Sequence, residues 1–187
     1  MEIFNLHLFF LFAYYIYEKN IIIIFKGEYK TMMKLTAKEV KDMVMKGIKL
    51  PDNMVVGENL YLSDTQIESI PDNMVVNGFL DLESTPIKSL PNNLVVRGDL
   101  YLSHTQIEYI PNNLVVGGDL DLAYTPIKSL PNNLIVRGDL DLSHTPIKSL
   151  PNNLVVRGNL FLKDTQIEMI QAGLTVTGYI DMHKTNI

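Results

Sequence analysis

The sequence contains no cysteine among its 187 residues. Disulfide bonds, thiolate metal sites and cysteine nucleophiles are therefore excluded. Cysteine usage gives no support for secretion, so we expect a cytoplasmic protein. The hydrophobic content of 47% is ordinary for a chain that buries a core, and we expect one folded unit.

The sequence also lacks an excess of basic charge. Its formal net charge is −5, and residues 51–187 carry eight Lys or Arg against sixteen Asp or Glu. Residues 1–50 have the opposite balance, with eight Lys and five acidic side chains. Because an acidic body repels phosphate groups, we expect no nucleic-acid partner.

Motifs of known catalytic chemistry are missing as well. There is no phosphate-binding loop, no metal-ligand cluster and no matched set of Ser, His and Asp. His104 and His144 hold equivalent places two repeats apart with Tyr124 between them, which indicates surface histidines. We therefore expect no enzymatic activity, no cofactor, no metal and no small-molecule substrate.

Residues 1–31 form an apolar leader that differs from the rest of the chain. Charged residues at 18–19 interrupt it before the length of about 20 residues that a spanning helix needs. It also lacks the basic start and small-residue cleavage site of a secretory signal. The codons for residues 26–28 can contain a ribosome-binding sequence, so we hypothesise that the natural chain starts at Met32 or Met33. In this hypothesis the leader is not part of the folded domain, and a membrane anchor is the alternative if it is translated.

Residues 32–50 are predicted to form an N-terminal capping helix. Thr36 and Glu39 have the spacing of a capping box, and apolar residues recur at helical spacing from Val40 onward. Gly47 supplies a stop signal. We expect this helix to cover the first exposed rung of the repeats that follow.

Residues 51–187 consist of seven gap-free repeats of twenty residues, such as PNNLIVRGDLDLSHTPIKSL at 131–150. Positions 1 to 20 are counted from the Pro that opens each repeat, which Gln171 replaces in the last one. Positions 4, 6, 8, 10 and 12 alternate with variable residues, so we expect a single strand with the even positions inward. A turn is predicted at positions 13 and 14, followed by an inward Thr at 15 and Ile at 17. Positions 1 to 3 are expected to make the other corner.

One repeat alone offers too few apolar side chains to offset the conformational entropy of ordering its backbone. Stacking the repeats as rungs supplies the missing burial and pairs each strand with its neighbour. We therefore expect a mainly β, parallel-stranded repeat solenoid with a short N-terminal capping helix.

The segment LDLSHTPIKSLPNNL at residues 140–154 resembles the leucine-rich-repeat pattern LxLxxNxLxxLPxxL. The resemblance implies a parallel strand at the first LxL, an Asn side chain that ties neighbouring loops together, and a concave binding surface of outward strand residues. Here a Thr at position 15 occupies the place of that Asn. The usual spacing before the strand is replaced by VxGxLxL, so a β-helix is the competing interpretation.

The most distinctive outward side chains are acidic. Position 9 carries Asp99, Asp119 and Asp139, and position 11 carries Asp121 and Asp141. Like charges repel at this spacing, so we expect the cluster to contribute nothing to folding. A patch of this kind suits a basic segment of a protein partner, with aromatic side chains as anchors. The predicted partner-binding residues are Asp99, Asp119, Asp121, Asp139, Asp141, Arg97, Arg137, Arg157, Tyr101 and Phe161.

Two functions follow from this sequence reading. The first is a noncatalytic protein-binding module that uses the outward strand face and is monomeric. The second is a structural or assembly element that associates through the ends of its solenoid. Duplication of one repeat, a solvated acidic strip and a calcium site are further interpretations of the acidic cluster.

Overall fold

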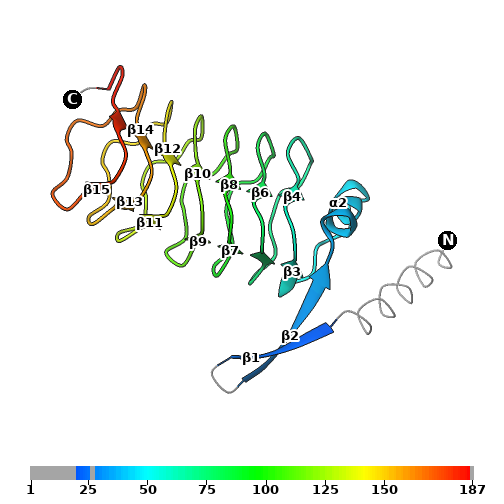
Figure 1. Cartoon of the computed structure of the whole chain (residues 1–187). Helices are drawn as coiled ribbons and strands as arrows, with labels where there is room; N and C mark the ends of the chain where they lie inside the picture. The colour runs from blue at the N-terminus through cyan, green and yellow to red at the C-terminus, as the bar shows by residue number, and fades with distance from the viewer. Residues whose placement is uncertain (1–19, 26–27, 186–187) are drawn as a thin grey trace.

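The computed structural model describes residues 20–25 and 28–185, and residues 1–19 of the predicted leader lie outside this part. The chain is a mainly β solenoid whose rungs stack side by side along one axis (Figure 1). Leu100, Leu120 and Leu140 pair in register, which confirms the predicted period of twenty residues. The predicted parallel-stranded repeat solenoid is thus confirmed.

Each rung contributes two short strands, and these belong to two different sheets. At positions 5 and 6, the first sheet contains β3 (Met54–Val56), β5 (Val75–Val76), β7 (Val95–Val96) and β9 (Val115–Val116). The same positions of the later rungs form a separate three-stranded sheet of β11 (Ile135–Val136), β13 (Val155–Val156) and β15 (Thr175–Val176). The second sheet uses positions 10 and 11, and its strands are β4 (Leu60–Tyr61), β6 (Leu80–Asp81), β8 (Leu100–Tyr101), β10 (Leu120–Asp121), β12 (Leu140–Asp141), β14 (Leu160–Phe161) and β16 (Ile180–Asp181). The rung strands that pair within each sheet do so in parallel, and the ladder at positions 5 and 6 is interrupted between β9 and β11.

The expectation of one strand from position 4 to position 12 is wrong, because the chain bends at the Gly of position 8. A Cβ on Gly118 would collide with Oδ1 of Asp99, and one on Gly138 would collide with Oδ1 of Asp119. The side chain at position 9 of one rung therefore fills the space beside position 8 of the next. Glu58 of the first rung is the one exception to glycine at position 8 in the repeats, and no earlier repeat precedes it.

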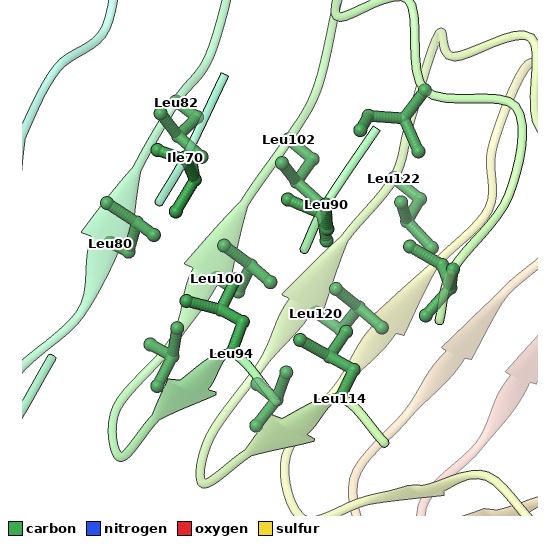
Figure 2. Packing of buried hydrophobic residues seen from close by; sticks show 14 of the residues in the cluster. Ile70, Leu80, Leu82, Leu90, Leu94, Leu100, Leu102, Leu114, Leu120 and Leu122 are labelled. Carbon is green, nitrogen blue, oxygen red and sulfur yellow. The ribbon is translucent and has the colours of Figure 1, made fainter. Parts of the chain in front are cut away.

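Leucine and valine side chains fill the space between the two sheets. Figure 2 shows Leu80 and Leu82 in line with Leu100, Leu102 and the next rung along the stack. These leucines have no exposed surface, and positions 4, 6, 10, 12, 15 and 17 are buried through the middle rungs. The predicted inward positions are thus confirmed except for position 8, which is only half-buried in the middle rungs. Removal of these side chains from water is the main driving force for stacking.

The two predicted corners are also confirmed. Position 14 takes the left-handed backbone conformation, for example φ 58° at His104. The Asn of position 3 does the same in every rung of the first six but the fourth, with φ 63° at Asn93. The Thr of position 15 closes the first corner within its own rung, since Thr125 Oγ1 donates to the Leu122 carbonyl oxygen at 2.7 Å. The rung-to-rung role that the leucine-rich-repeat resemblance implies for this position is therefore wrong. Its hydroxyl reaches back three residues and does not reach the next loop.

A hairpin precedes the first rung. Strand β1 (Asn20–Phe25) pairs antiparallel with β2 (Glu28–Leu35), and β2 pairs parallel with β3. Met33 and Leu35 are buried in the core, so β2 extends the first sheet beyond the repeats. The hypothetical start at Met32 or Met33 falls inside β2 and stays a prediction.

The predicted helix is α2 (Ala37–Met45), which lies at the N-terminal end of the solenoid beside β4 (Figure 1). Its capping box is present, because the Glu39 amide donates to Thr36 Oγ1 at 3.3 Å and the Thr36 amide donates to Glu39 Oε2 at 2.8 Å. Val40 is fully buried against the rungs. In the described part of the chain, no helix has the length and apolar character needed to cross a bilayer.

Candidate partner-binding face

The outward side of the second sheet carries most of the predicted site. Positions 9 and 11 flank the buried leucine of position 10, so their side chains lie on the opposite side from the core. Tyr101, Asp121, Asp141 and Phe161 are partners in neighbouring strands. We call the surface made by Asp99, Asp119, Asp121, Asp139 and Asp141 the acidic face.

The three carboxylates at position 9 form a ladder along the stack. Oδ1 of Asp99 accepts the Asp119 amide at 2.9 Å, and Oδ1 of Asp119 accepts the Asp139 amide at 2.7 Å. Asp139 accepts the Asn159 amide at 2.7 Å in the same way. Hydrogen bonds to a charged acceptor are stronger than neutral ones. The expectation that these carboxylates contribute nothing to folding did not include these contacts, and we expect the ladder to stabilise the stack.

The two carboxylates at position 11 stabilise the following turn. Oδ1 of Asp121 accepts the Ala123 amide at 2.9 Å, and Oδ1 of Asp141 accepts the Ser143 amide at 2.7 Å. This contact between a side chain and the amide two residues later is an Asx turn. Replacing both residues by lysine would remove two such contacts and lower stability as well as charge.

Burial and neighbouring charge alter two groups on this face. Burial raises the pKa of the Asp121 carboxyl, and the nearby Asp141 charge raises it further, against the opposing hydrogen bonds from Ala123 and Ser103. Burial also raises the pKa of Tyr101 to about 12, together with its hydrogen bond to Asp99. Tyr101 is therefore protonated at neutral pH and donates to Asp99 Oδ2 at 3.0 Å.

Because burial raises the pKa of Asp121, we expect Asp121→Asn to be a stabilising change at neutral pH. Folding favours the protonated carboxyl, so the benefit is complete below the ordinary pKa of 3.8 and is lost as pH rises through the folded value. Asparagine keeps an oxygen acceptor for the Ala123 amide and carries no charge. We expect the melting temperature at pH 7 to rise by about 2 °C, with no difference from wild type near pH 3. Differential scanning calorimetry across this range checks the sign, and a lower melting temperature at pH 7 would contradict it.

The predicted arginines lie apart from the acidic face. Arg97, Arg137 and Arg157 are exposed at position 7, on the first-sheet side of the glycine bend. Between residues 28 and 185, none of them lies within ion-pair distance of an acidic side chain. The five carboxylates of the acidic face therefore have no cationic partner within this part of the chain.

Aromatic side chains border the acidic face at both ends. Phe79 contacts Tyr61 and Tyr101 edge to face, with ring centroids 4.7 and 5.9 Å apart. At the other end Phe161 contacts Tyr179 in the same geometry at 5.5 Å. The sequence pattern identified Tyr101 and Phe161 as site residues, but not Tyr61, Phe79 and Tyr179. All three occupy positions 9 or 11, the outward positions of the second sheet, and this shared position would have identified them.

The histidines of position 14 lie in a separate column at the turn. The rings of His104, Tyr124 and His144 stack almost parallel, with centroid distances of 4.6 and 4.3 Å. His144 Nδ1 lies 3.6 Å from Asp164 Oδ2. In the portion that the structure describes, no three His, Asp or Glu side chains are grouped so that they could hold a metal ion.

No protein-family model matches the chain, and no curated protein matches it.

Proposed function

We propose that this protein is a noncatalytic protein-binding module that uses the acidic face to bind a basic segment of a protein partner. The observation that carries the proposal is the set of five adjacent carboxylates without a cationic partner in the described residues. Partly desolvated carboxylates of like charge attract a complementary basic surface. The aromatic pairs at each end supply the anchors on which binding energy commonly concentrates.

The hydrogen bonds on the acidic face leave oxygens available for a partner. Asp119 and Asp141 each use Oδ1 for a backbone amide, and no contact of Oδ2 is present among the described residues. In each residue one oxygen thus accepts a backbone amide, and the other has no hydrogen bond among the described residues. Arginine or lysine side chains spaced along an extended segment match such a row of acceptors.

The resemblance of residues 140–154 to leucine-rich repeats supports the same mode of use. In that family the outward residues of the parallel strands bind partners, and positions 9 and 11 are the corresponding residues in this solenoid. We propose that the chain acts as a leucine-rich-repeat-like module, with the second sheet as its binding surface.

Neutralising the face tests the proposal without removing its structural contacts. The variant Asp119→Asn, Asp121→Asn, Asp141→Asn keeps the oxygens that accept backbone amides and removes three charges. We expect a partner captured from native lysate by the wild type to bind this variant at least about tenfold more weakly, as measured by calorimetry with the purified partner.

The matched control removes three charges elsewhere, with Asp42→Asn, Asp64→Asn and Glu168→Gln. Asp42 belongs to α2, and Asp64 and Glu168 hold positions 14 and 18 of their rungs, outside the acidic face. The control should bind as the wild type does. Equal affinity of the wild type and the acidic-face variant would refute the proposal.

Self-association is the second candidate function, and the last rung favours it. Leu174, Val176 and Ile180 are only partly buried, whereas the same positions are fully buried in the rung before. In the described residues β15 and β16 each pair on one side only. Sedimentation velocity over a range of concentrations distinguishes the two functions, since an assembly element should form larger species that Ile180→Lys dissolves.

A further inference from the structure

A groove of about 480 Å³ lies between the loop that follows α2 and the first rung. Its lining includes Gly47, Leu50, Gln66, Ile67 and Glu68. Its volume lies in the range of known ligand pockets. The groove is separate from the acidic face, because its rung residues come from positions 16 to 20 and from the start of the next rung.

The groove exists because one isoleucine is missing from the stack. Counted back from Pro51, Gly47 occupies position 17, where every repeat has isoleucine. A Cβ on Gly47 would meet no atom within 4 Å, so the space beside it is open. Ile67 is consequently 7% exposed, whereas Ile87 and the later isoleucines through rung 6 are fully buried.

A backbone amide beside the groove, that of Gln66, lacks among the described residues the hydrogen-bond acceptor that equivalent amides have in other rungs. The Gln106 amide donates to the Ile87 carbonyl oxygen at 3.0 Å, and the Gln166 amide donates to that of Ile147 at 3.2 Å. In both cases a rung with the sequence TQIE follows a rung with the sequence TPIK. Gln66 begins the same TQIE sequence in rung 1, and its amide has no backbone acceptor in the described part of the chain.

The charge around the groove favours a cation. At position 18, Lys128 Nζ lies 2.7 Å from Glu108 Oε2 of the preceding rung, whereas Lys88 and Lys148, in the rungs before Glu108 and Glu168, form no ion pair among the described residues. Glu68 holds the same position beside the groove and has no cationic partner among the described residues. The lining carries three carboxylates, from Glu68, Asp52 and Asp72, against one cation from Lys49.

We propose that this groove binds an extended protein segment in which an aliphatic residue is followed by a lysine. The aliphatic side chain packs on Ile67 in the place of the missing isoleucine. Its carbonyl oxygen accepts the Gln66 amide, and the lysine pairs with Glu68. The aliphatic side chain and its carbonyl oxygen thus repeat what a TPIK rung supplies to the TQIE rung that follows it, and the lysine contact is added for the charge of Glu68. This site is independent of the function proposed for the acidic face.

A synthetic peptide with the sequence TPIKSL, blocked at both ends, is the probe. We expect titration into the uniformly ¹⁵N-labelled full chain to shift the Gln66 amide resonance downfield in a saturable way, because that amide gains an acceptor. The amides of Asp119, Asp121 and Asp141 should not move. An unchanged Gln66 resonance at millimolar peptide, or shifts confined to the acidic face, would overturn the proposal.

A charge exchange tests the lysine contact. Glu68→Lys should weaken binding of TPIKSL by about fivefold, the size of one exposed ion pair, and should strengthen binding of the peptide TPIESL. Glu68 is exposed, so the variant should keep the circular dichroism spectrum of the wild type. Glu168→Lys is the matched control at position 18 of rung 6 and should leave both affinities unchanged. Equal binding of the two peptides to wild type would refute the assigned lysine contact.

Discussion

Gly138→Ala is expected to lower the free energy of unfolding by about 3 kcal/mol. The new Cβ would lie 2.8 Å from the Asp119 amide nitrogen and 2.8 Å from the Gly118 carbonyl carbon. Both are backbone atoms of the neighbouring rung, and they can move only if the two rungs separate. The collision would also displace the Asp119 carboxylate from the Asp139 amide.

Gly57→Ala is the matched control for this substitution. At Gly57 the nearest atom to a new Cβ is Lys34 Cε at 3.6 Å, which is ordinary van der Waals contact. We expect a change within about 0.5 kcal/mol. Urea denaturation of both variants measures the difference, and a Gly138→Ala variant as stable as Gly57→Ala would show that the bend at position 8 is not constrained by the neighbouring rung.

The double substitution Asp119→Ala, Asp139→Ala is expected to cost about 3 kcal/mol of folding free energy. It leaves the amides of Asp139 and Asn159 without their side-chain acceptors. Relief of repulsion between like charges offsets this loss by about 1 kcal/mol at most. Thermal denaturation and hydrogen exchange at these two amides should both report the loss.

The asparagine counterpart separates the hydrogen bond from the charge. Asn59 and Asn159 already accept the Phe79 and Tyr179 amides at 3.1 Å from position 9. The variant Asp119→Asn, Asp139→Asn should therefore match the wild type within about 0.5 kcal/mol while losing the same charges as the alanine variant. Equal stability of the two double variants would mean that the ladder contributes nothing.

The repeat period made the fold predictable. A twenty-residue spacing without gaps fixes which residues meet in adjacent rungs, as Leu120 and Leu140 do. Apolar residues at even positions then identify the core, and Thr36 with Glu39 identifies the start of α2. These inferences hold because burial and capping depend on local sequence pattern.

The division of each rung between two sheets did not follow from the same pattern. Alternation from position 4 to position 12 is compatible with one strand or with two strands joined by a bend. Glycine at position 8 carried the missing information, but its reason lies in the neighbouring rung, where Asp119 occupies the space beside Gly138.

The positions of the acidic side chains were predictable from the repeat, but their hydrogen bonds were not. Outward positions identify Asp119 and Asp121 as neighbours, yet only coordinates show that each also accepts a backbone amide. The groove beside Gly47 was not predicted, because it arises from a residue that the stack lacks. The missing isoleucine is recognised only when the segment before Pro51 is aligned with the repeats.

Our central proposal is that Asp119 and Asp141 each accept a backbone amide with one oxygen, in the next rung for Asp119 and in its own turn for Asp141, and contact a basic partner with the other oxygen. Carbodiimide crosslinking of the captured complex, followed by peptide mass spectrometry, tests it most directly because the reagent joins a carboxylate to a lysine in contact with it. We predict crosslinks from Asp119 or Asp141 to lysines of the partner. Crosslinks restricted to carboxylates outside the acidic face, such as Glu108 and Glu168, would contradict the claim.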